Sequence, residues 1–121
     1  MEFELKHGLP FGKDADAEMQ YRVELRELTA GDIIEAEEAS EKLMLGPNGP
    51  VLVSSPARMG TELLRRQVKR VGKLQGLSLG QLKSLHPDDL ELLNAQVVAR
   101  DALLAREIAD RGRADGAPGD H

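Results

Sequence analysis

The chain has 121 residues, a length suited to one domain, and it contains neither cysteine nor tryptophan. The absence of cysteine excludes disulfides, thiolate metal sites and cysteine nucleophiles. A formal net charge of −5 argues against a nucleic-acid partner, and no apolar run approaches the ~20 residues that a membrane-spanning helix requires.

An N-terminal β-hairpin is predicted from two alternating segments. Phe3 and Leu5 alternate with charged residues, and a second apolar series recurs at every other position, Met19, Tyr21, Val23 and Leu25. Glycine and proline interrupt Gly8–Asp16, which predicts a loop between the strands. An isolated hairpin is only marginally stable in water, so we expect its apolar face to pack on helices that follow.

The first helix is predicted over Ala30–Leu45. Thr29 stands at the N-cap position, and Asp32 lies three residues on, where its carboxylate can accept from the first free amides. Glycine and proline end the helix, and Gly46–Pro56 is expected to be a loop with a short extended piece at Val51–Val53.

A second helix is predicted over Pro56–Gln75, with Ser55 as its N-cap. At 100° per residue its leucines and valines fall on one face, and the opposite face is basic, with Arg58, Arg65, Arg66, Lys69, Arg70 and Lys73. This basic face either meets an acidic partner or is solvated and paired with the acids of the first helix, Glu35, Glu37, Glu38 and Glu41. The segment 51–86 sums to +6 between flanks of −7 and −4, which favours internal pairing.

Two more helices follow. Ser78 and Gln81 form a capping-box pattern for a short leucine-rich helix, which ends at His86-Pro87. The last helix begins at Pro87 with two acids near its positive end and continues to about Arg111. Residues 112–121 are rich in glycine and small polar residues, so we expect a disordered tail after a single domain over 1–111.

The last helix carries apolar residues on more than one side. One stripe consists of Leu90, Leu93, Val97, Leu104 and Ile108, and a second of Leu92, Ala99 and Leu103. A small domain does not easily cover several apolar faces. We therefore hypothesise that one stripe packs inside the domain and the other serves self-association or partner binding; the alternative is that the domain covers both.

No catalytic, cofactor-binding or metal-binding residues are assigned. His7, His86 and His121 stand at none of the helical spacings that ligand sets use, and a helix start accounts for His86 beside Asp88 and Asp89. No candidate nucleophile has a base beside it in the sequence. We therefore expect a protein that is not an enzyme and acts through protein contacts.

Two segments of the chain resemble the tail assembly chaperones of Mu-like and related long-tailed bacteriophages. One is Val23–Leu43, VELRELTAGDIIEAEEASEKL, in which a strand leads into a capped acidic helix. The other is Leu77–Leu93, LSLGQLKSLHPDDLELL, with a short helix, a break and a longer helix. The resemblance spans residues 18–111 and assigns no residue-level partner contact.

The resemblance implies a non-enzymatic assembly factor with an α+β fold, a hairpin packed on about four helices. It implies that the chain binds the tape-measure protein, promotes assembly of the tail-tube protein around it, and is absent from the finished virion. It also implies a longer form made by translational frameshifting and a possible homo-oligomer. The first residues, MEFELKHG, carry acids where a signal peptide carries bases, so we expect the host cytoplasm as the location. A structural tail subunit and a small DNA-binding regulator are the alternatives, and the acids at the start of the last helix argue against the latter.

Overall fold

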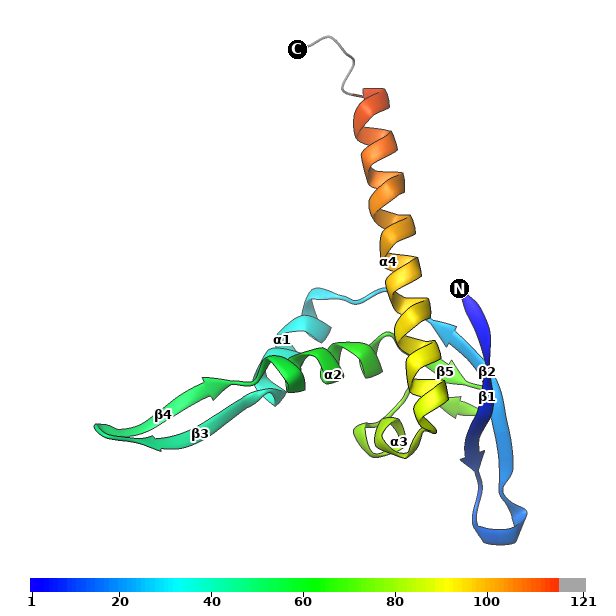
Figure 1. Cartoon of the computed structure of the whole chain (residues 1–121), viewed down its shortest axis with the longest axis horizontal. Helices are drawn as coiled ribbons and strands as arrows, with labels where there is room; N and C mark the ends of the chain where they lie inside the picture. The colour runs from blue at the N-terminus through cyan, green and yellow to red at the C-terminus, as the bar shows by residue number, and fades with distance from the viewer. Residues whose placement is uncertain (116–121) are drawn as a thin grey trace.

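The computed structural model describes residues 1–115, with only the backbone described at residue 14 and at residues 112–115. Figure 1 shows a body of sheet and helices from which a two-stranded arm and the end of the last helix project. In chain order the elements are β1 (Glu2–Phe11), the 3-10 turn η1 (Asp14–Asp16), β2 (Glu18–Leu25), α1 (Ala30–Ala39), β3 (Glu41–Gly46), β4 (Gly49–Ser54), α2 (Pro56–Arg66), β5 (Val68–Val71), β6 (Leu74–Gln75), α3 (Leu79–Ser84) and α4 (Pro87–Asp115).

The body is built on an antiparallel sheet of four strands in the order β1-β2-β5-β6. Val23 of β2 lies opposite Phe3 on one side and Val71 on the other. One face of the sheet packs on residues of α2, α3 and α4, and every member of the buried hydrophobic cluster is aliphatic: Leu5, Leu9, Val23, Leu25, Leu64, Val68, Val71, Leu77, Leu82, Leu85, Leu93 and Val97. The predicted α+β class, with an N-terminal hairpin and a long last helix, is confirmed.

The hairpin is longer than predicted and its tip is left uncovered. β1 continues to Phe11 through part of the expected loop, with a register shift between Glu4 and Leu9. Of the alternating residues in β2, Val23 and Leu25 are buried, whereas Met19 and Tyr21 are 44% and 43% exposed. The helices therefore cover the hairpin as far as Leu9, which is 2% exposed, and leave its tip in solvent.

The first helix ends earlier than predicted. The expected capping box forms, because the Thr29 hydroxyl accepts from the amide of Asp32 and the Asp32 carboxylate accepts from the amide of Thr29. The helix stops at Ala39, where the Ser40 hydroxyl donates to the carbonyls of Ala36 and Glu37. This local bond competes with helix continuation.

The prediction for Gly46–Pro56 is only partly right: the expected extended piece at Val51–Val53 lies within β4, but the chain forms a second hairpin there and not a loop. β3 and β4 pair from Glu41 opposite Ser54 to Gly46 opposite Gly49, around a turn at Pro47 and Asn48. Two short apolar runs flank that turn, a pattern typical of a hairpin. Ser55 and Pro56 then begin α2 as predicted.

The second helix does not reach Gln75. It ends at Arg66, and the next residues form β5, which pairs with β2, and β6, which folds back on β5 after a turn at Gly72. Val68 and Val71 are buried in the core, 2% and 1% exposed. Burial and pairing with a distant strand outweigh the local helical periodicity.

Helices α3 and α4 follow the predicted plan. Ser78 and Gln81 form the expected capping box. α4 begins at Pro87 and runs to Asp115, beyond the predicted end at Arg111. Of the tail predicted over 112–121, residues 112–115 belong to this helix, and 116–121 lie outside the described residues.

Asp89, in the first turn of α4, holds the helix against β1. Its carboxylate accepts hydrogen bonds from the backbone amides of Lys6, His7 and Gly8, at 2.7, 3.0 and 3.0 Å. These amides lie in the stretch of β1 where the register with β2 shifts, so the bulge supplies donors that the sheet does not use. Burial alone would raise the pKa of Asp89, but the three amide bonds lower it below its usual value.

Candidate functional site

The basic residues predicted to share one helical face lie on two different elements. Arg65 and Arg66 end α2, whereas Lys69 and Arg70 belong to β5. The prediction of one continuous basic helix is therefore wrong. That prediction assumed a rotation of 100° per residue, which holds in a helix but not in a strand.

The basic side chains of α2 surround one buried carboxylate. Glu62 is 1% exposed, and its oxygens lie 2.9 to 3.2 Å from guanidinium nitrogens of Arg58, Arg65 and Arg66. Burial alone would raise the pKa of Glu62, but hydrogen bonds from Arg65 and Arg58 and the nearby positive charges hold it below its usual value. Because a buried charge is tolerated only when it is paired, the three arginines offset the cost of burying the Glu62 carboxylate.

The basic residues of β5 pair with the strand beside them. Lys69 and Arg70 lie 2.9 and 3.0 Å from the carboxylate of Glu24 on β2. Together with Glu62, this glutamate supplies the negative charge that we had assigned to the acids of the first helix. Internal pairing is thus present, with different partners from those predicted.

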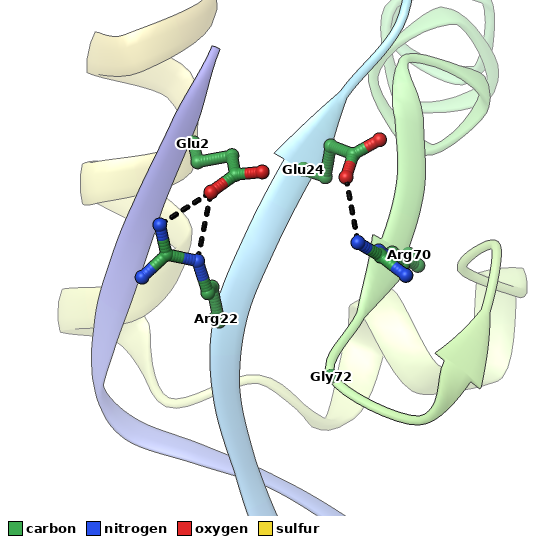
Figure 2. A pocket seen from close by; sticks show the side chains of 5 residues that line it. All are labelled: Glu2, Arg22, Glu24, Arg70 and Gly72. Carbon is green, nitrogen blue, oxygen red and sulfur yellow. Dashed lines mark hydrogen bonds and ion pairs between the residues drawn. The ribbon is translucent and has the colours of Figure 1, made fainter.

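The exposed face of the sheet carries a shallow hollow lined by charged side chains. Figure 2 shows Arg22 reaching Glu2 and Arg70 reaching Glu24 across β1, β2 and β5, with Gly72 at the rim. The hydrogen bond and charge of Glu2 raise the pKa of Arg22, and the hydrogen bond from Lys69 lowers the pKa of Glu24. Within this hollow the shifted groups keep their charges near neutral pH, which suits ion pairing and not proton transfer.

The predicted stripes of α4 divide along the length of the helix. Leu93 and Val97 face the core, 2% and 7% exposed, and Arg100 donates to the carbonyl of Arg26 at 2.7 Å. Beyond this bond the helix extends away from the body (Figure 1). Leu103 and Ile108 are 47% and 63% exposed.

The second stripe follows the same division. Leu92 is half-buried beside Lys6 in a shallow hollow between α4 and β1, whereas Ala99 is exposed, like Leu103. The three residues hypothesised to bind a partner therefore run along one side of α4 from the body to its free part.

Among the residues whose side chains the structure describes, large apolar side chains are most exposed on β3 and β4, where the sequence predicts a helix end, a loop and a short extended piece at Val51–Val53. Its six large apolar side chains are 41 to 88% exposed: Leu43, Met44, Leu45, Val51, Leu52 and Val53. The signal in the sequence was the pair of three-residue apolar runs on either side of Gly-Pro-Asn-Gly. We had assigned the first run to a helix end.

The fold brings together two histidines that are far apart in the sequence. His7 Nε2 lies 3.2 Å from an Asp88 oxygen, and the rings of His7 and His86 stack with centroids 3.6 Å apart and planes 11° from parallel. These three side chains offer ligand-type atoms within 4.8 Å of one another. Lone pairs of nearly parallel rings do not converge on one point, so this arrangement suits a ring stack with an ion pair better than a metal centre.

Comparisons with known proteins place the chain. A family model described as "Tail assembly protein gp41" matches residues 5–113. The chain belongs to the gp41 tail assembly family. The matched region includes the sheet, the exposed hairpin and most of α4.

Three curated relatives agree with this assignment. The probable tail assembly protein gp41 of Escherichia phage Mu is 49% identical over 116 residues, which cover 94% of this chain and 81% of that protein. The probable tail assembly protein FS-gp41 of the same phage is 50% identical over 110 residues, 89% of this chain but 58% of that protein. Mu-like prophage FluMu protein gp41 of Haemophilus influenzae is 43% identical over 119 residues, 97% of this chain and 91% of that protein. No solved structure matches.

The family assignment supports a role in phage tail assembly. Among the described residues, no helix is both long enough and apolar enough to cross a membrane.

Proposed function

We propose that this gp41 family member is a tail assembly chaperone that binds the tape-measure protein of its phage and promotes the gathering of tail-tube subunits around it. The family match over residues 5–113 carries the proposal, because the named relatives are described as tail assembly proteins. In this proposal the chain makes and breaks no covalent bonds. It acts in the host cytoplasm and leaves before the virion is complete.

The proposed docking surface for the tape-measure protein is the side of α4 that runs from the body to the free part of the helix. Leu92, Ala99 and Leu103 follow one side of the helix, and charged residues lie between them. An amphipathic helix of the partner can cover such a stripe in helix-to-helix packing. The covering is reversible because the exposed apolar area on α4 is modest.

The basic residues have a smaller part in this proposal. Arg65 and Arg66 are 24% and 15% exposed in the cluster around Glu62, and they share its single carboxylate with Arg58. Lys69 and Arg70 are more exposed, 59% and 50%, but they share Glu24. Any contact that they make with a partner competes with this internal pairing.

A longer product of the same gene is part of the proposal. The chain covers 58% of the length of FS-gp41, so that relative carries much sequence outside the match. Mass spectrometry of infected cells would show a second product that shares peptides with this chain. Finding this chain alone would remove the longer form from the proposal.

Co-expression with the tape-measure protein of the same phage tests the main proposal. We expect the tape-measure protein to move from the insoluble to the soluble fraction and to co-purify with this chain. Leu92→Gln combined with Leu103→Gln should abolish the capture, whereas Asp101→Asn combined with Glu107→Gln on the same helix should retain it. Equal capture by both double variants would contradict the role of α4. Recovery of the chain from purified virions would instead identify a structural tail subunit.

A further inference from the structure

The hairpin of β3 and β4, residues 41–54, forms an arm with apolar side chains on both faces. Leu43 lies opposite Leu52, and Leu45 opposite Pro50. Because side chains alternate along a strand, these four residues share one face, which we name the leucine face. Met44, Val51 and Val53 occupy the other face. Leu43 is 70% exposed, Leu52 68% and Leu45 88%.

The rest of the chain leaves the arm uncovered. Figure 1 shows the arm leaving the body beyond α1 and α2, on the side away from the sheet. Its contacts are mainly between its own two strands. A two-stranded hairpin is only marginally stable alone in water, and such a hairpin gains stability when other strands pack on it.

Hydrogen bonds and burial fix the base of the arm, and they set the direction in which the arm leaves the body. Ser40, just before β3, is 3% exposed, and its carbonyl accepts from the amide of Ser55 at 3.0 Å. The Ser40 hydroxyl also closes the end of α1 through Ala36 and Glu37. Helices α1 and α2, which flank this base, pack on each other.

Charge on the arm is confined to its base. Glu41 and Lys42 stand where the arm begins, and no residue from Leu43 to Ala57 is charged, although 31% of the chain is. Beyond its base the arm therefore presents no charge that would select an acidic or basic partner. The same part of a second copy is likewise apolar and uncharged, and a two-fold axis makes both copies use the same surface patch.

The exposed area of the leucine face suits a weak, reversible dimer. From their exposed fractions, the six large side chains present roughly 600 Å² per copy over both faces, the size of the largest patch on a typical monomer. The three leucines hold roughly 400 Å² of this, so two copies packed on their leucine faces bury about 800 Å² in total, the size of a weak interface. Each chain has a net charge of −5, so two bodies repel at close range. Projecting arms let the copies meet while the bodies stay apart.

We propose that the arm is a self-association surface: two copies pack arm against arm, with their leucine faces at the centre of the contact. The contact brings four strands together, whereas a single hairpin has two and is only marginally stable on its own. This inference does not rest on the identity of the partner that α4 binds.

Solution mass tests the proposal. We expect the wild-type chain to sediment at about twice the 13.2 kDa of one chain, at about 100 μM, well above a micromolar dissociation constant. Leu43→Gln combined with Leu52→Gln should halve that mass without changing the circular dichroism spectrum. Val98→Gln combined with Ile108→Gln is the matched control, because these α4 residues are equally exposed, 66% and 63%. This control should keep the wild-type mass.

Three results would overturn the proposal: a monomeric wild type, an arm variant that keeps the wild-type mass, or a control variant that dissociates as completely as the arm variant. A monomeric wild type whose arm variant loses the tape-measure protein would reassign the arm to that partner. A dimeric wild type that fails to capture the tape-measure protein would overturn the proposed function and leave this inference standing.

Cysteine cross-linking locates the contact, since the natural chain has no cysteine. Under a mild oxidant, Leu43→Cys and Leu52→Cys should each form covalent dimers at least tenfold faster than Met44→Cys on the opposite face. Equal or faster cross-linking of Met44→Cys would refute the central place of the leucine face.

Discussion

Asp89→Asn tests how α4 is attached to the sheet. The substitution keeps the shape of the side chain but removes its charge and turns one acceptor oxygen into an NH₂ group. In the structure, one carboxylate oxygen accepts from Lys6 and the other from both His7 and Gly8. The better orientation of an asparagine amide keeps the latter two bonds and points its NH₂ at the Lys6 amide.

The expected cost follows from the bonds that change. A hydrogen bond to a charged group contributes about 1.5–3 kcal/mol, and an unsatisfied buried donor costs about 1–3 kcal/mol. Asp89 is fully buried, 0% exposed, so water does not replace the lost acceptor. With one bond lost and two weakened, we expect the free energy of unfolding to fall by about 2–4 kcal/mol.

Urea unfolding followed by circular dichroism measures this loss, and Asp88→Asn is the matched control. Asp88 stands next to Asp89 in the same first turn, so both substitutions remove a similar interaction with the helix dipole. The side chain of Asp88 is 54% exposed, and surface substitutions of this kind change stability by about 0.5 kcal/mol or less. Equal losses for the two variants would refute the claim that the amide bonds of Asp89 hold α4.

The pH dependence gives the same reasoning a second test. Because the pKa of Asp89 is lowered on folding, its contribution is present above the unfolded pKa, about 3.9, and is lost as the pH falls through the folded value. The stability gap between wild type and Asp89→Asn should therefore be constant from neutral pH to about pH 5 and shrink below about pH 4. A gap that stays constant down to the lowest pH at which the wild type is folded would contradict an ionised Asp89.

Further substitutions test other parts of the fold. Glu62→Gln weakens the carboxylate shared by three arginines, so urea unfolding should show a loss of about 3 kcal/mol; a loss below about 1 kcal/mol would mean that the arginines find other acceptors. Gly72→Ala should lower the thermal midpoint, equivalent to about 1–2 kcal/mol, because its φ is +57° and a Cβ would meet the side chain of Gln20. In contrast, Gly60→Ala, in α2 with open space around it, should raise the midpoint by the equivalent of about 0.5–1 kcal/mol. The two substitutions should shift the thermal midpoint in opposite directions, and shifts in the same direction would contradict this reasoning.

Local signals determined the starts of the helices. Thr29, Ser55 and Ser78 each cap the helix that the sequence predicted after them. A cap is decided by residues within one turn, so neighbouring sequence suffices to predict it. The family was also recognisable, since its two segments are patterns of capped helices and leucines that follow one another along the chain.

The end of the second helix depended on a distant strand. The spacing of Val68 and Val71 fits a helical stripe as well as a strand. They form a strand because β2 has a free edge with which the segment can pair. The arm illustrates the same ambiguity, because short apolar runs suit a buried helix and a hairpin equally. We had placed Leu43 and Leu45 on a helix, which left the largest exposed apolar surface unrecognised.

The sequence alone thus determined the cap positions and the family, because each depends on residues close together in the chain. Only the tertiary structure decided which acids neutralise Arg65, Arg66, Lys69 and Arg70. It likewise placed Asp89 beneath the bulge of β1 and left the arm in solvent. Ion pairing and burial depend on which segments meet in space, and those meetings are set by the free energy of the whole core.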